Sequence, residues 1–262
     1  MKQTLRIVAV PLLISAAVTL LRLAGELGHW SVAWFSPATG GILPSGWSWV
    51  VGITWLPALF GPYFACRLWG AGHRPPNLIL ALGFALLGVA MVFFGMRAIT
   101  PRLRAAPLWL LAIWGVAVVA AGLQAFGWRK LAGTLLVYGL GSRAAVAIVM
   151  VLALAFNWGT HYDFVDSPGL QQLPFVTRVV ALALIPQLVF WVGFTMLLGC
   201  LAGAVTALFL AARAGTARAW PMRWDSRTRP NGGAAPGRSC LCRTPTRHGK
   251  ERLHLLPSGR RS

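Results

Sequence analysis

Arg22, Glu26 and His29 stand four and three residues apart in an otherwise apolar stretch of the sequence. On a helix these steps place the three side chains on one face. Glu26 and His29 form E-x-x-H, a spacing that supplies two ligands to one ion in carboxylate-bridged metal proteins. Arg22 can pair with Glu26 and lower the cost of both charges near a membrane. The competing interpretation is an ordinary polar helix end that meets water.

A second polar segment, NWGTHYDFVDSPG over 157–169, contains His161, Asp163 and Asp166. Carboxylate oxygens and imidazole nitrogens together suit zinc, manganese or iron, and the same groups can act as a general acid and base. We therefore hypothesise an outward-facing polar or divalent-metal site built from Glu26, His29, His161, Asp163 and Asp166. No other cofactor is evident. The alternative is a water-facing loop in which D-S-P-G forms a turn.

The composition places these residues in a membrane protein. Hydrophobic residues make up 57% of the 262-residue chain and charged residues only 11%, whereas soluble domains carry about 25% charged residues. The apolar residues also come in long runs rather than in amphipathic stripes. We expect an all-α integral membrane protein, a bundle of about six transmembrane helices, with five to seven conceivable.

The apolar runs predict spans at about 7–26, 47–69, 77–96, 107–127, 132–157 and 187–212. Pro57 and Pro62 are expected to kink the second of these. Pro186 is expected to divide the last apolar stretch, so that a helix over about 170–185 lies at the membrane interface. Two short spans within 174–212 are the alternative. Residues 1–213 then form the bundle.

Lysine and arginine in the connecting segments predict the orientation. Segments 27–46 and 158–173 contain neither residue and are placed outside, so the two polar segments share a side. Both termini are then cytoplasmic, in a membrane of the bacterial cytoplasmic (inner) type. Segment 97–106, RAITPRLRAA, contradicts this pattern because it carries arginines on the outer side.

Residues 214–262 are rich in Arg, Pro and Gly and cannot bury enough apolar surface to offset the entropy of ordering, so this tail is expected to be disordered. Two interpretations are open: a basic tail that contacts anionic lipid, or sequence read out of frame from GC-rich DNA. The formal net charge of +19 is not taken as a sign of nucleic-acid binding, since no folded basic module is visible.

Two further features lie inside the apolar runs. Arg143 is a central membrane charge if its span begins near Leu131, and it snorkels to the headgroups if the span begins near Tyr138. A functional Arg143 would contact an anion or a lipid headgroup, with Gln124 or Gln187 as polar neighbours. Gly199 and Gly203 form G-x-x-x-G, which indicates close helix packing, internal rather than at a dimer face.

Three classes of function remain. The absence of any strong catalytic motif favours a non-enzymatic accessory or assembly component that contacts the lipid bilayer and another membrane protein. A small transporter or channel is the first alternative. The second is a membrane enzyme that uses the outward His/carboxylate site, with or without a metal ion.

Overall fold

The structure is a computed structural model that describes residues 2–31, 33–35, 50–103, 108–164 and 171–219, and these parts contain helices and no strands. Residues 214–219 of the predicted tail are helical, and from position 220 onward the tail lies outside the described residues. The helices are α1 (Lys2–Leu27), α2 (Leu56–Gly70), α3 (Leu78–Leu103), α4 (Leu108–Phe156), α6 (Phe175–Val179) and α7 (Val192–Ala219), with π-helical segments η1 (Val180–Leu184) and η2 (Pro186–Trp191) between the last two.

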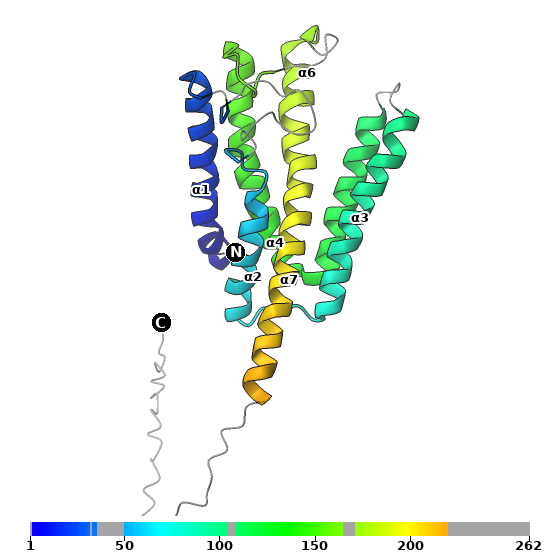
Figure 1. Cartoon of the computed structure of the whole chain (residues 1–262). Coiled ribbons are helices and arrows are strands. Elements are labelled where there is room, and N and C mark those ends of the chain that lie inside the picture. Colours follow the sequence, from blue (N-terminus) through cyan, green and yellow to red (C-terminus); the bar gives the residue numbers. More distant parts are fainter. Residues whose placement is uncertain (1, 32, 36–49, 104–107, 165–170, 220–262) are drawn as a thin grey trace, which may run out of the picture. The chain divides into compact units, whose positions relative to one another are not determined.

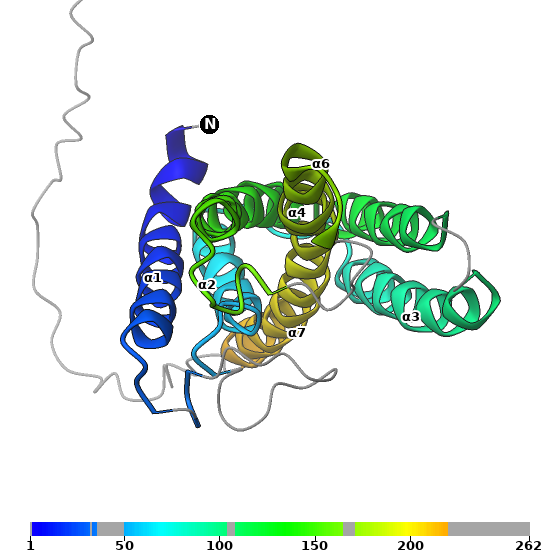
Figure 2. The same cartoon turned by 90° about the horizontal axis from the view of Figure 1, so that it is seen from above.

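The all-helical class predicted from the sequence is confirmed. Within the described residues, four stretches are long and apolar enough to cross a membrane: Gln3–Leu27, Leu78–Ala98, Leu111–Phe156 and Phe175–Gly215. In the compact unit 1–220, α4 and α7 lie centrally, and α1 packs on α4 and α2. Seen from above, α3 and the neighbouring part of α4 form one edge of this unit and α1 the other (Figures 1 and 2).

Helix α4 consists of two limbs joined at Trp128, whose φ of −149° and ψ of 85° are not helical. The break lets the chain reverse between the stretches predicted as spans 107–127 and 132–157. Gly127 allows the turn to approach α3 closely, because a Cβ there would lie 3.0 Å from the Cα of Ala81. The Trp128 indole Nε1 donates a hydrogen bond of 3.1 Å to the carbonyl of His73, which fixes the reversal against the α2–α3 connection.

The predicted division at Pro186 is not observed, because the chain stays helical from α6 through η1 and η2 into α7. A proline inside an α-helix lacks an N–H and clashes with the carbonyl four residues earlier. Here the turns around Pro186 widen to π-helix, which relieves that clash without ending the helix. The interfacial location of 170–185 stays a prediction.

Helix α2 begins later than the predicted start at 47. Residues 50–55 form turns and bends, and the helix starts at Leu56. Pro57 therefore lies in the first helical turn, where its missing N–H costs nothing, instead of kinking a longer helix. Pro62 is inside the helix as expected.

Glycines let α2 and α7 approach each other. A Cβ on Gly61 would lie 2.9 Å from the Cα of Gly199, and a Cβ on Gly203 would lie 3.2 Å from the carbonyl oxygen of Gly61. Gly199 also faces the Leu135 side chain of α4. The G-x-x-x-G pair of α7 thus lies at an internal contact of three helices.

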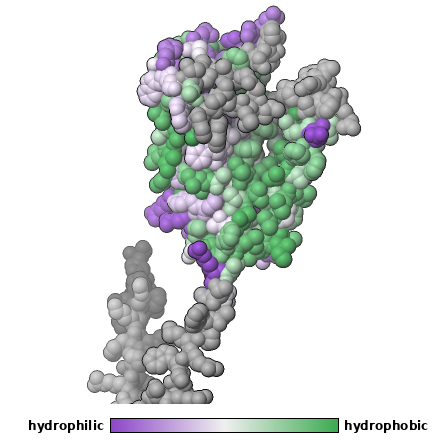
Figure 3. All heavy atoms as spheres, in the orientation of Figure 1, coloured by the Kyte–Doolittle hydropathy of each residue, from purple (hydrophilic) through white to green (hydrophobic). Residues whose placement is uncertain are grey.

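Besides a buried hydrophobic core, the described residues include many large apolar side chains on the surface and several polar side chains in the interior. On α1, Leu13 is 70% exposed, while Ser15 on the same helix is completely buried. Ile79 and Phe126 are likewise 78% and 70% exposed. Apolar residues cover much of the face seen in Figure 3, and strongly hydrophilic residues lie toward its two ends.

Candidate functional site

The two polar segments identified in the sequence meet through Glu26. Its carboxylate accepts a hydrogen bond of 3.0 Å from Arg22 Nε on the preceding turn of α1. It also accepts a bond of 2.9 Å from the backbone N–H of His161. His161 Nδ1 lies 2.6 Å from Glu26 Oε1 and 2.8 Å from Oε2. These bonds tie the end of α1 to the loop that follows α4.

This geometry determines which nitrogen of the His161 ring carries a hydrogen. Ionised carboxylate oxygens accept hydrogen bonds but cannot donate them, so Nδ1 must carry a hydrogen. In the neutral imidazole, Nε2 then holds the lone pair. The Glu26 side chain is only 1% exposed, against 18% for His161. Glu26 is therefore a buried anchor, and His161 is the one member of this pair with a partly accessible face.

Burial lowers the pKa of His161 below its ordinary 6.5, and the positive charge of Arg22 acts in the same direction. The hydrogen bond and negative charge of Glu26 oppose this shift without reversing it. The neighbouring Tyr162 has its phenol pKa raised by burial. At neutral pH the loop therefore presents an uncharged imidazole and an uncharged phenol.

The lowered pKa of His161 predicts that acid destabilises the fold. In the unfolded chain the ring takes up its proton near pH 6.5, whereas the folded protein does so only at lower pH. The unfolded state thus binds more protons, so stability is intact above about pH 6.5 and decreases as the pH falls below it. Thermal unfolding followed by tryptophan fluorescence across this range measures the effect. His161→Asn, which keeps a donor near the Nδ1 position but does not titrate, should flatten the profile; an unchanged slope would contradict the assignment.

The Asp163 carboxylate accepts hydrogen bonds from residues of its own loop. It accepts bonds from Gly159 N at 2.9 Å, Thr160 N at 2.7 Å and Thr160 Oγ1 at 2.7 Å. Gly159 has a φ of +69° and Asn157 one of +50°, both left-handed conformations that Gly and Asn tolerate. The segment predicted as a catalytic or metal-binding loop is thus a tight turn closed by Asp163.

Asp163→Asn should lower the free energy of unfolding by about 1–2 kcal/mol. Both carboxylate oxygens accept hydrogen bonds, so the amide nitrogen of asparagine must face either the Gly159 N–H or the two donors of Thr160. The measurement is chemical or thermal unfolding of the purified protein. Thr160→Ser, which keeps the hydroxyl that bonds to Asp163, serves as the matched control and should behave as the wild type. Equal stability of Asp163→Asn and the wild type would show that the turn does not need the carboxylate.

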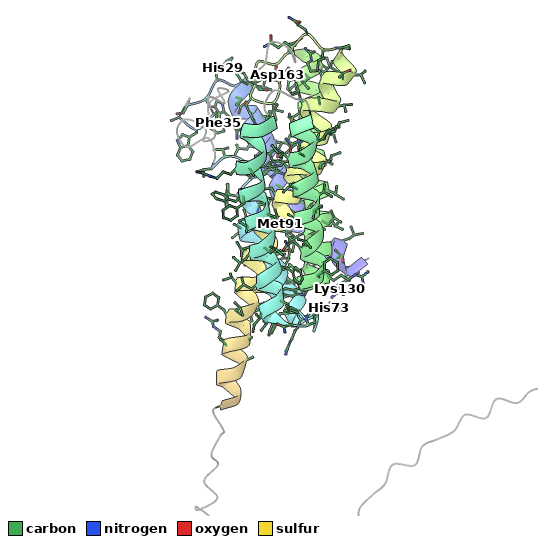
Figure 4. The ribbon with its side chains drawn as sticks, turned by 90° about the vertical axis from the view of Figure 1, so that its right-hand side faces the viewer. His29, Phe35, His73, Met91, Lys130 and Asp163 are labelled. Atoms are coloured by element: carbon green, nitrogen blue, oxygen red, sulfur yellow. The ribbon has the colours of Figure 1, made fainter. Side chains whose placement is uncertain are left out.

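The His29 side chain does not join this cluster. His29 is exposed, with a φ of +49° just beyond α1, and contacts Glu26 only through a backbone bond of 3.2 Å. His29 and Asp163 lie at the same end of the bundle, opposite His73 and Lys130 (Figure 4). Asp166 lies outside the described residues. Within the described part of the chain, no three His, Cys, Asp or Glu side chains are grouped to hold a metal ion. The metal site stays a prediction.

Sequence reasoning missed that the polar face of α1 continues toward its middle. Thr19 accepts, through its carbonyl, a hydrogen bond of 3.3 Å from the Tyr162 hydroxyl. Ser15 Oγ lies 2.8 Å from the Tyr138 hydroxyl on α4. Ser15, Thr19, Arg22 and Glu26 are all buried and follow each other at four-, three- and four-residue steps. That helical spacing was the available signal.

Arg143 forms a second buried polar site. It lies within the second limb of α4, which runs from the Trp128 break to Phe156, and its residue is only 3% exposed. Its guanidinium carbon lies 4.9 Å from the ring centroid of Trp191. Nε and Nη2 have no hydrogen-bond partner among the described residues. Arg143 is therefore enclosed by neighbouring helices in the middle of its limb rather than extended toward a helix end.

Of the two glutamines proposed as neighbours of Arg143, Gln187 belongs to the segment whose Trp191 contacts Arg143. Gln187 Nε2 contacts Met150 Sδ at 3.4 Å, while Gln187 Oε1 is buried without a partner in the described structure. Gln187 is one helical turn from Trp191, the residue under Arg143. Gln124 instead joins α3 to α4, since its Nε2 donates to the carbonyls of Phe84 at 3.1 Å and Ala120 at 3.0 Å.

No protein-family model matches the chain, and no curated protein or solved structure is significantly similar to it.

Proposed function

We propose that this protein is a multi-pass integral membrane protein that acts as a non-enzymatic accessory or assembly component. The observation that carries the non-enzymatic part is the state of Glu26, whose buried carboxylate is occupied by Arg22 and by two groups of His161. A catalytic carboxylate must reach a substrate, whereas this one holds two chain segments together. The proposed partners are the bilayer and another membrane protein.

The exposed apolar surface and the buried polar side chains support the membrane assignment. Hydrophobic side chains that are two-thirds exposed or more would be costly in water and are favourable against lipid tails. Buried serine, threonine and glutamine side chains between helices are typical of membrane bundles. We count six passes, because the candidate stretch Leu111–Phe156 is broken at Trp128 and the 15-residue α2 adds a short one.

The orientation follows from the charges, with both termini on the cytoplasmic side of a bacterial inner membrane. The test is cysteine labelling in intact cells. Cys66, Cys200, Cys240 and Cys242 are replaced by serine, and single cysteines are placed at position 29 or 74. An impermeant reagent should label position 29 and not position 74. Labelling of position 74 alone would show that the orientation is the opposite of the proposed one. Recovery of the protein in the soluble fraction would refute the membrane assignment.

Metal analysis separates the accessory component from the membrane enzyme. The enzyme alternative requires a divalent ion or an accessible acid and base at the outer cluster. We expect purified wild-type protein and His161→Ala to contain the same low metal content by mass spectrometry. A stoichiometric metal ion in the wild type that is lost in His161→Ala would overturn the proposal in favour of the enzyme.

One observation favours the transporter as a second candidate. Buried polar groups extend from Glu26 along α1 to Ser15 and Tyr138, and Arg143 lies on the same limb of α4 as Tyr138. Transport needs such groups at membrane depth. Flux of a small anion into proteoliposomes that disappears in Arg143→Gln would favour this candidate over the accessory role.

A further inference from the structure

Among the described residues, no anion compensates the buried cation Arg143. The acidic residues that the structure describes are Glu26 and Asp163, and both are engaged at the end of the bundle. Arg143 is about 20 Å along the helix axis from Phe156, where that end begins, at about 1.5 Å per residue. Arginine cannot give up its proton in a protein. The charge therefore persists, with two N–H-bearing nitrogens lacking partners in the described structure.

The stacking on Trp191 does not meet this need. A guanidinium above an indole ring gains a cation–π attraction, but its N–H groups point outward in the plane of the fork and still require acceptors. Gln187 Oε1 is a buried hydrogen-bond acceptor that is also unpartnered in the described structure. A ligand with an acceptor oxygen would pair with the Arg143 donors, and a hydroxyl group or a bound water molecule would donate to Gln187 Oε1.

An apolar groove of about 280 Å³ lies between the second limb of α4 and the π-helical stretch, and its lining starts at Ala144, the residue that follows Arg143. Ala144 follows Arg143 in sequence and lines the groove, as does Ala147, which is one turn further along the same helical face. Leu184 and Leu188, on either side of Gln187, form the opposite wall. The α4 wall also contains Ile148, Val151 and Leu152, so the whole lining is aliphatic and suits an acyl chain.

The helix that forms the second wall has unusual geometry. Segments η1 and η2 are π-helical on both sides of Ile185, and η2 packs on α4. Wide π turns displace side chains from their α-helical positions and occur frequently at functional sites. Trp191, the last residue of η2, is the one that contacts Arg143.

We propose that Arg143 and this groove bind a long-chain fatty acid, with its carboxylate on the Arg143 guanidinium and its acyl chain along Ala144, Ala147 and Leu188. The inference deepens the proposed function and rests on it, since the ligand would enter from the bilayer. The chemistry is charge-assisted hydrogen bonding in a low-dielectric surrounding, where such bonds are strongest.

The experiment measures binding of tritiated palmitate and of the uncharged analogue hexadecanol to the full chain in a nonionic detergent. The wild type should prefer palmitate by about tenfold or more, the value expected for a charge-assisted contact. Arg143→Gln should remove that preference, and Arg129→Gln, which changes an exposed arginine of the same helix, should keep it. Ala144→Phe should weaken both probes by filling the groove.

Ligand-free Arg143→Gln should unfold at the same temperature as the wild type or a higher one, because an uncompensated buried charge is removed. Palmitate should raise the unfolding temperature of the wild type only. The proposal is overturned if the wild type does not prefer palmitate to hexadecanol, a result that stands even if Arg143→Gln fails to fold. It is also overturned if Arg143→Gln binds palmitate as the wild type does. Recovery in the membrane fraction, measured first, tests the proposed function separately.

Discussion

Replacing Glu26 by glutamine is expected to lower the free energy of unfolding by about 3 kcal/mol, since breaking a buried ion pair leaves its partners buried without compensation. The carboxylate accepts bonds from Arg22 Nε and from two groups of His161, and its side chain is 1% exposed. Glutamine keeps one acceptor oxygen but loses the charge and adds donors that face Arg22 and His161. Thermal or denaturant unfolding of the purified protein gives the measurement.

A double-mutant cycle separates the ion pair from packing. Arg22→Met keeps most of the aliphatic stem, so the loss in the double variant Arg22→Met/Glu26→Gln should be smaller than the sum of the two single losses. His29→Asn is the matched control, because it alters the other member of E-x-x-H at an exposed, left-handed position that asparagine tolerates. It should change stability by no more than about 0.5 kcal/mol. A similarly small effect of Glu26→Gln would show that the cluster does not hold the bundle together.

The outer cluster shows what sequence spacing can and cannot predict. The step from Arg22 to Glu26 is local, so helix geometry alone predicts that they pair. His161 lies 135 residues from Glu26 in the sequence. The count of lysines and arginines in the connecting segments predicts only that the two residues lie on the same side of the membrane. That count could not show that His161, rather than His29, is the histidine that reaches the carboxylate. The deciding factor is where α1 ends and the chain turns left-handed at His29.

Helix boundaries illustrate the same limit. The sequence predicts a kink at Pro57 and a division at Pro186, yet Pro57 lies in the first turn of α2 and the turns around Pro186 widen without ending the helix. Which outcome occurs depends on the turn in which the proline lies and on the packing of neighbouring helices, and a hydropathy pattern contains neither. For Arg143, the sequence left two alternatives because they required different helix starts. The continuous limb from Trp128 to Phe156 places it centrally.

Gly61→Ala is expected to destabilise the bundle by about 3 kcal/mol, at the upper end of overpacking effects, because backbone rather than a flexible side chain occupies the space. The added Cβ would lie 2.9 Å from the Gly199 Cα and 3.0 Å from its carbonyl carbon, so α2 and α7 would have to separate. Gly122→Ala is the matched control, since no heavy atom lies within 4 Å of a Cβ built there. It should leave stability unchanged or increase it by up to about 1 kcal/mol.

The oligomeric state distinguishes this internal contact from a dimer interface. If Gly199 and Gly203 served a second copy of the chain, Gly199→Leu would shift a dimer to a monomer while each monomer stayed folded. The contacts of Gly199 with Leu135 and of Gly203 with Gly61 predict the opposite. Gly61→Ala and Gly199→Leu should both lower the unfolding temperature, and the mass of the protein–detergent complex measured by light scattering should not change. A halved mass with an unaltered unfolding temperature would assign these glycines to an interface between copies.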